Sequence, residues 1–184
     1  VIIGGGSLGV SLLYHLSEEG WNDVILLEKG ELTSGSTWHA AGLCSNFIGN
    51  MTVAKIHNYS IRLYDEILPS QSGNPSAFHK CGSLRVGYSR IEEEWFNHLF
   101  SRSKNIPCEF NIISKDEAKD LHPFMNFDNA RIIVSTPNDG HVDPSSVVMT
   151  MSQIASSKGS KINRFNRVKD IKKTQGGEWE VITE

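Results

Sequence analysis

The stretch VIIGGGSLG (residues 1–9) decides the fold of this chain. Its β-branched run stops at three glycines, as a buried parallel strand does. From Ser7 to Glu19 apolar residues recur at a helical spacing, and a second apolar run, Val24–Leu27, ends at Glu28. Strand, helix and strand within about 30 residues predict a βαβ unit.

The glycines match the GxGxxG pattern of a dinucleotide cradle, at the point where a strand passes into a helix. In such a cradle Gly4 permits the tight turn, Gly6 lets the backbone approach a pyrophosphate, and Gly9 lets helix and strand pack closely. The start of the helix offers free N–H groups to the anion. Glu28 could accept hydrogen bonds from both ribose hydroxyls, and its charge disfavours NADP. A glycine-rich turn without a ligand would leave Glu28 at the strand end without a reason.

Composition and charge exclude several classes of protein. The 184 residues carry a net charge of −3, which disfavours nucleic acid or an anionic membrane as partner. No apolar run approaches the roughly 18 residues of a membrane span. Three cysteines without a CxxC pair give little support to a disulfide framework or a zinc site, so we expect no metal and an intracellular soluble protein. Val1 lies inside an apolar run with no initiator Met, so we interpret the chain as a piece of a longer one.

Helices and short strands are expected after residue 50. We expect an amphipathic helix from Thr52 that ends before Pro69, and another that buries one face. That face comprises Ile91, Trp95, Phe96, Leu99 and Phe100.

The second half of the chain carries clear helix signals. Ser114 and Glu117 form a capping box, and Asp143 precedes a proline as the N-cap of a further helix. That helix is expected to bury Val147, Val148, Met151, Ile154 and Ala155. Two strands, over residues 161–174 and 178–183, are expected to meet at a Gly-Gly turn.

The loop ELTSGSTWHAAGL (residues 31–43) favours FAD over NAD. Its small residues let the backbone donate to a ligand and approach a planar ring, and a single imidazole, His39, lies in the middle. Spacing alone favours an ordinary loop or buried histidine at this position over a residue that carries the flavin.

Several stretches resemble one family of flavoproteins. The segments VILLEKGELTSGSTWHAAGL, KIHNYSIRLYDEI, FHKCGSLRV and PNDGHVDP are similar to the dimethylglycine and sarcosine dehydrogenase family, which belongs to the D-amino-acid-oxidase-like FAD-dependent oxidoreductases. The resemblance covers the whole chain, and STWHAAGL and DGHVDP are its most specific parts. It implies an α/β fold: a Rossmann-like FAD-binding fold of the D-amino-acid-oxidase type with part of an inserted, truncated mixed α+β substrate domain. The FAD-binding domain would then comprise residues 1–50 and, incompletely, 141–184, and the inserted region residues 51–140.

The resemblance also implies the residues that contact FAD. His39 would carry the flavin covalently through a ring nitrogen. Ser7 and Leu8 would lie by the pyrophosphate, Glu28 and Lys29 at the ribose, and Val168 at the adenine. The segment along the flavin would be Gly35, Ser36, Thr37, Trp38, His39, Ala40, Ala41, Gly42 and Leu43.

The implied reaction is the oxidation of an N-methylated amino acid, by transfer of a hydride from the N-methyl carbon to the flavin. The electron acceptor would be an electron-transfer flavoprotein or oxygen, and tetrahydrofolate would bind a C-terminal domain outside this sequence. The protein would lie in the mitochondrial matrix of a eukaryote or the cytoplasm of a bacterium. No catalytic residue can be assigned, although His141 is a candidate neighbour of the active site. Asn138 and the segment 45–48 depart from the family pattern, which leaves the identity of the amine open.

Two alternatives stay open at this point. A non-catalytic relative, similar to the regulatory subunit of pyruvate dehydrogenase phosphatase, shares the architecture but is expected to lack the flavin-linking histidine. An NAD-dependent oxidoreductase is the other, and the long segment around His39 disfavours it.

Overall fold

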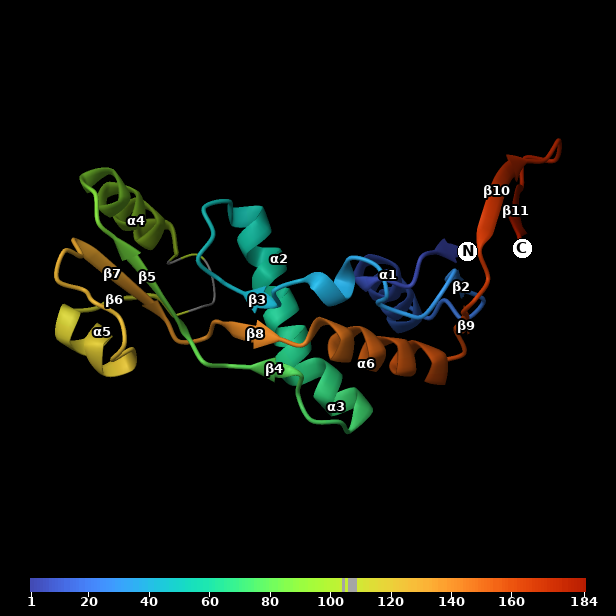
Figure 1. The fold of residues 1–184 in the computed structure, drawn as a ribbon. Coiled ribbons are helices and arrows are strands. Elements are labelled where there is room, and N and C mark those ends of the chain that lie inside the picture. Colours follow the sequence, from blue (N-terminus) through green and yellow to red (C-terminus); the bar gives the residue numbers. More distant parts are fainter. Residues whose placement is uncertain (104, 106–108) are drawn as a thin grey trace. The chain divides into compact units, whose positions relative to one another are not determined.

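The computed structural model describes residues 1–103, 105 and 109–184 (Figure 1). They form two compact units, each described by itself below. The first comprises Val1–Gly42, Ile67–Ala77 and Asp143–Glu184, and the second Leu43–Glu66 and Phe78–Val142. The expected boundaries after residues 50 and 140 thus differ from the unit boundaries, and residues 67–77 return to the first unit. The assignment of these segments to FAD-binding and substrate domains stays a prediction.

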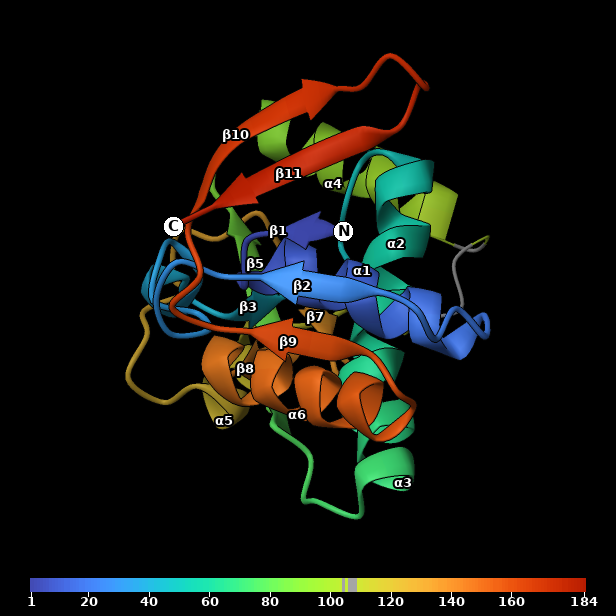
Figure 2. The same ribbon diagram turned by 90° about the vertical axis from the view of Figure 1, so that its right-hand side faces the viewer.

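The first unit is built on a parallel sheet. Its strands are β1 (Ile2–Ile3), β2 (Ile25–Leu27) and β9 (Lys161–Asn163), in the order β1-β2-β9. Leu26 lies opposite Ile2 on one side and Ile162 on the other. Helix α1 (Ser7–Glu18) connects β1 to β2, so the predicted βαβ unit is confirmed (Figure 2).

Helices α1 and α6 (Pro144–Ser157) pack against each other in this unit. Helix α1 buries Val10, Leu13 and Tyr14. All five residues predicted to be buried on α6 are buried. Helix α3 (Leu68–Ser72) also packs on α6, and the Tyr14 hydroxyl donates to Gln71 Oε1 at 2.8 Å.

The prediction of one strand over residues 161–174 is wrong. The chain forms β9 in the parallel sheet and then β10 (Val168–Lys173), which pairs in a hairpin with β11 (Trp179–Thr183). Between β9 and β10 Phe165 takes a left-handed φ of 54°. The Asn166 N–H donates to the carbonyl of Glu28 at 2.9 Å. The segment between β9 and β10 is therefore still bonded to the end of β2.

Pro69 does not end the helix that begins near residue 51. Helix α2 (Met51–Arg62) passes into a π-helical segment, η2 (Leu63–Ile67), and α3 follows directly. Pro69 lies in the first turn of α3, where a missing N–H leaves no intrahelical bond unmade. Helical structure therefore continues to Ser72.

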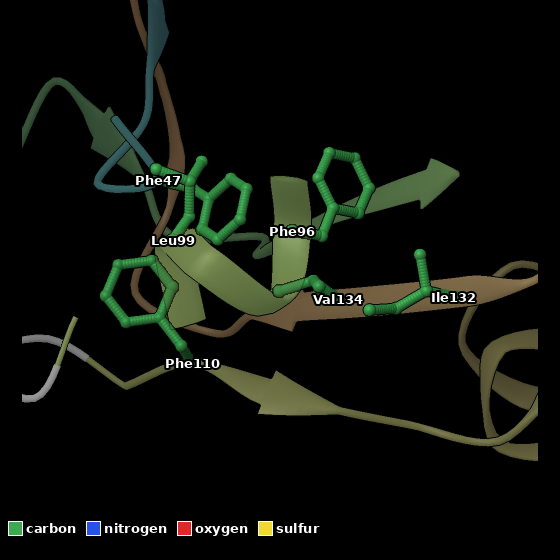
Figure 3. Packing of buried hydrophobic residues seen from close by; sticks show 6 residues of the cluster. All are labelled: Phe47, Phe96, Leu99, Phe110, Ile132 and Val134. Carbon is green, nitrogen blue, oxygen red and sulfur yellow. The ribbon is translucent and has the colours of Figure 1, made fainter. Parts of the chain in front are cut away.

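The second unit contains an antiparallel sheet with the strand order β5-β7-β6. Its strands are β5 (Ser83–Gly87), β7 (Ile132–Thr136) and β6 (Asn111–Ile112). Helix α4 (Arg90–Ser103) contributes to a core that Figure 3 shows; its members are Phe47, Phe96, Leu99, Phe110, Ile132 and Val134.

Two of the residues expected on the buried face of α4 are exposed. Phe96 and Leu99 are buried, but 78% of Ile91 and 48% of Trp95 are exposed. Ile91 lies in the first turn of the helix, where the chain enters from a surface loop. The buried face is therefore narrower than the apolar pattern predicts. The capping box before α5 (Lys115–Leu121) is confirmed, because Ser114 and Glu117 bond each other's backbone N–H groups.

A second small sheet joins segments distant in sequence, and the sequence did not predict it as a sheet. Strand β8 (Gly140–Val142) lies between β3 (Leu43–Cys44) and β4 (Phe78–His79). A Cβ on Gly140 would lie 2.1 Å from the carbonyl oxygen of His79, so only glycine permits this pairing.

The buried carboxylate of Asp139 fixes the turn before β8. It is 1% exposed and accepts hydrogen bonds from the backbone N–H of Asn46 at 2.8 Å and from the hydroxyls of Ser83 at 2.7 Å and Thr136 at 2.6 Å. Several donors to one ionised group offset much of the cost of removing its charge from water. Asp139 thereby ties three chain segments of the second unit together. Within the part of the chain that the structure describes, no helix has both the length and the apolarity to cross a membrane.

Replacing Asp143 tests the cap of α6. Its side chain accepts from Ser146 N–H at 2.8 Å, and hydrogen bonds from the hydroxyl and N–H of Ser146 lower its pKa from the ordinary 3.8. We expect Asp143→Ala to lower the free energy of unfolding by about 1 kcal/mol at neutral pH, measured by urea denaturation. A lowered folded-state pKa means that this contribution is present above the ordinary pKa and is lost as the pH falls through the folded-state value.

Asp143→Asn is the control, because asparagine caps a helix without titrating at acid pH. It should keep most of the stability and show a weaker loss on acidification than the unmodified protein. An unchanged acid dependence in Asp143→Asn would contradict the assignment.

Candidate dinucleotide-binding site

The glycine turn between β1 and α1 shapes one end of the candidate site. Gly4 has a φ of +105°, a conformation that residues with a Cβ rarely adopt, and its N–H donates to the carbonyl of Leu27 at 2.8 Å. A Cβ on Gly9 would lie 1.9 Å from the carbonyl oxygen of Gly4. Helix and turn therefore approach each other as closely as glycine allows, as predicted from the spacing.

The start of α1 has no side-chain cap of its own. Gly6 occupies the N-cap, and the Ser7 N–H donates instead to the Thr37 hydroxyl at 2.9 Å. A Cβ on Gly6 would lie 3.1 Å from the same hydroxyl oxygen. Thr37 is buried and begins the short helix η1 (Thr37–His39), so the loop 31–43 is anchored to the helix that should bind the pyrophosphate.

Glu28 lies at the end of β2 and is 9% exposed. Its Oε2 accepts the Gly5 N–H at 2.6 Å and its Oε1 accepts the Gly30 N–H at 2.8 Å. Each carboxylate oxygen has a second lone pair, so both oxygens retain the capacity to accept a hydroxyl. Sequence reasoning missed Gly5 and Gly30; the signal was the middle glycine of GGG and the glycine two residues after the acid.

The imidazole of His39 is exposed on η1. Its Nδ1 lies 3.1 Å from the carbonyl oxygen of Gly35, and its ring centroid lies 3.8 Å from that of Trp38, which is 58% exposed. A carbonyl can only accept, so Nδ1 carries the proton of this hydrogen bond and the lone pair of a neutral ring falls on Nε2. The geometry thus offers a nucleophilic nitrogen on a fixed ring.

The structure also locates the remaining predicted contacts. Leu8 is 87% exposed at the start of α1, and Leu43 is 80% exposed in β3 of the second unit. Val168 begins β10 and pairs with Thr183. The other predicted residues, all in the first unit, are Lys29, Gly35, Ser36, Ala40, Ala41 and Gly42. Their contacts with FAD stay a prediction.

These residues fit a dinucleotide. Glycines fill the positions where a Cβ would collide, the helix start lacks a side-chain cap, and a buried carboxylate adjoins the turn. Among residues 1–103, 105 and 109–184 no group of three or more His, Cys, Asp or Glu side chains could hold a metal ion.

A parallel βαβ unit with this turn and acid defines a Rossmann-like, dinucleotide-binding protein. The comparison with protein families is more specific: the chain belongs to the DAO family of FAD dependent oxidoreductases, whose family model matches residues 1–184.

The similar curated proteins include dehydrogenases and one regulatory subunit. The chain is 38% identical over 183 residues to human mitochondrial dimethylglycine dehydrogenase, covering 100% of this chain and 21% of the relative. It is 33% identical over 162 residues to human mitochondrial sarcosine dehydrogenase, covering 88% and 18%. The mouse mitochondrial pyruvate dehydrogenase phosphatase regulatory subunit is 32% identical over 162 residues, with the same coverage of 88% and 18%. The chain thus spans about a fifth of the length of these relatives.

Solved structures share the fold. L-proline dehydrogenase from P. horikoshii has a TM-score of 0.88 at 23% identity, covering 98% of this chain and 47% of that one. An FAD-bound L-α-glycerophosphate oxidase from Mycoplasma pneumoniae has a TM-score of 0.82 at 22% identity, covering 99% and 48%. These matches confirm the predicted fold class.

Gly9→Ala tests the close approach of α1 to the turn. Because the added Cβ would meet the Gly4 carbonyl, we expect the free energy of unfolding to fall by roughly 1–3 kcal/mol or more. Gly35→Ala is the matched control, since a Cβ there meets nothing within 4 Å, and it should change stability by less than about 0.5 kcal/mol. Similar values for the two variants in denaturant titrations would refute this role of Gly9.

Glu28→Gln tests the buried carboxylate. The glutamine amide must point its NH₂ group at one of the two backbone N–H donors, so we expect a loss of about 1.5–3 kcal/mol in the free energy of unfolding. Glu31→Gln is the control, because the Glu31 side chain forms an exposed ion pair with Arg164 at 2.5 Å, worth about 0–1 kcal/mol. Equal losses of unfolding free energy in the two variants, measured by urea denaturation, would contradict the stabilising role of the two hydrogen bonds to Glu28.

Proposed function

We propose that the protein is an FAD-dependent dehydrogenase that oxidises an N-methylated amino acid, such as dimethylglycine or sarcosine, with its flavin covalently attached to His39. The proposal has two parts, the substrate class and the covalent attachment. They rest on different observations.

The substrate class is supported by the relatives. Two of them are a dimethylglycine dehydrogenase and a sarcosine dehydrogenase, and both names denote N-methylated amino acids. The chain spans about a fifth of their length, and none of its residues is assigned to bind the substrate carboxylate or amine. The choice between these amines stays open.

The geometry of His39 is the observation that carries the covalent attachment. The ring is exposed, its Nδ1 is engaged by the Gly35 carbonyl, and the Trp38 ring lies against it with centroids 3.8 Å apart. A nucleophile must present a lone pair in a held orientation, and Nε2 meets this requirement.

The remaining residues of the site would hold and orient the cofactor. We assign the pyrophosphate to the N–H groups at the start of α1, and the ribose hydroxyls to the Glu28 carboxylate. The bound flavin supplies the oxidising chemistry by accepting two electrons and a proton from the substrate carbon. This chain's part is to keep that ring in place by means of the loop that Thr37 anchors.

The regulatory relative supports a second candidate, a non-catalytic protein with the same fold. The exposed, oriented imidazole of His39 favours the enzyme, because a protein without flavin has no use for a nucleophile there. Family membership disfavours the nicotinamide alternative. The electron acceptor, tetrahydrofolate on a further domain and a mitochondrial location remain part of the proposal, the last because these relatives are mitochondrial.

Acid precipitation of the intact protein tests the attachment. We expect the yellow colour to stay with the precipitated protein, and His39→Ala to move it to the supernatant because no covalent bond remains. The readout is the flavin absorbance of both fractions.

His15→Ala is the matched control. His15 also places Nδ1 on the carbonyl four residues earlier, Ser11 at 2.7 Å, but lies in α1. It should leave the colour in the pellet. Colour that remains in the pellet of His39→Ala would refute the attachment, and a protein that holds no flavin at all would favour the non-catalytic candidate.

A further inference from the structure

A thiol and two imidazoles meet at the small sheet of the second unit. His79 and His141 are directly opposite in β4 and β8, and their rings stack with centroids 5.1 Å apart at 21°. Cys81 follows β4, and its exposed Sγ lies 3.7 Å from Nδ1 of His141 and 3.5 Å from the carbonyl oxygen of Gly82. An imidazole in this position can receive the thiol proton when the sulfur attacks.

The same thiol lines a cavity of about 540 Å³ in this unit. Lys80 and His122 supply basic groups to its wall, and among the described residues that line it none is acidic. Leu121 and Met125 contribute apolar surface. The cavity is large enough for a small organic molecule, and its charge suits an anion.

We propose that Cys81 is a modification site that undergoes thiol–disulfide exchange with a small anionic disulfide bound in this cavity. The Cys81 sulfur gives its proton to His141 and attacks one sulfur of the disulfide. The disulfide bond breaks, a new one forms between Cys81 and the attacked half, and the other half leaves as a thiolate that takes up the proton. Cys81 is oxidised and the leaving half is reduced, so the disulfide is the only oxidant required.

The structure distinguishes Cys81 from Cys44. Burial, followed by the charge of Asp139, raises the pKa of the Cys44 thiol, which keeps it protonated and slow to attack. Cys81 is exposed and adjoins basic groups. Cys108 lies outside the described residues, so the experiment removes it.

The test uses the intact protein with Cys44→Ser and Cys108→Ser, and as its partner the same protein with Cys81→Ser added. Each is incubated with glutathione disulfide, which is anionic, bis(2-hydroxyethyl) disulfide, which is neutral, or cystamine, which is cationic. Intact-mass spectrometry and peptide mapping follow the rate and position of the mixed disulfide. We expect modification at Cys81, fastest with glutathione disulfide relative to the rate of each reagent with a free cysteine peptide.

Two substitutions test the neighbours. His141→Gln should slow the reaction with all three disulfides by about tenfold or more, while His98→Gln on α4 should not. Lys80→Gln should slow the anionic reagent by about threefold relative to the neutral one, the effect of one unit charge across several ångströms of water.

Three outcomes of these measurements would contradict the role of Cys81. A Cys81 that stays unmodified, equal relative rates for the three disulfides, or an unaltered rate in His141→Gln would each overturn the proposal. Because the readout is a mass on one thiol, failure here says nothing against the proposed flavin chemistry, and the loss of flavin in the acid precipitation says nothing against Cys81.

Discussion

The first unit depends on the contact between the Glu28 carboxylate and the Gly5 N–H. It joins the end of β2 to the turn after β1, two points 23 residues apart, at 2.6 Å. The second oxygen holds Gly30, where the loop toward His39 starts. A buried carboxylate without such donors would be costly, so the acid and the turn require each other. One side chain thereby fixes the strand end, the start of α1 and the start of the loop in a single geometry.

Backbone groups make most of this site, which explains its composition. Glycine is needed where the turn meets α1, because a Cβ on Gly9 would lie 1.9 Å from the Gly4 oxygen. Beside the loop, a Cβ on Gly5 would lie 2.5 Å from the Leu32 side chain, which would have to move. Thr37 then supplies the hydroxyl that the N-cap glycine lacks. Side chains set the positions of the N–H groups, and the N–H groups are what an anion would contact.

The sequence correctly predicted the structural elements that depend on residues close together in the chain. It did not predict several strands whose pairing depends on residues far apart in the chain. The caps at Ser114 and Asp143 and the buried face of α6 follow from residues within two turns, and all are confirmed. The sheet β3-β8-β4 joins segments about 60 and 100 residues apart, and no local pattern announces two- or three-residue strands. The strand expected over residues 161–174 divides because β9 is held by β2 and β10 by β11. Within the site, the glycines and Glu28 were predictable from a local pattern. The role of Thr37 as a substitute cap was not, because Thr37 is 30 residues away from the N–H of Ser7 that it accepts.

Exposure supports the proposal that a large planar ligand covers part of this surface. Single exposed apolar residues are common and by themselves indicate little. In the first unit, however, Leu8 is 87% and Trp38 58% exposed, and the family resemblance implies that both contact the cofactor. Leu8 follows Ser7 at the start of α1, and the Trp38 ring lies beside that of His39, tilted by 34°. A flavin ring that packs against the indole would remove apolar area from water, at about 25 cal/mol per Å². The exposed side chains of Trp38 and Leu8 thus lie on η1 and at the start of α1, beside groups that can hydrogen-bond, which suits a molecule that carries both a flavin and a pyrophosphate.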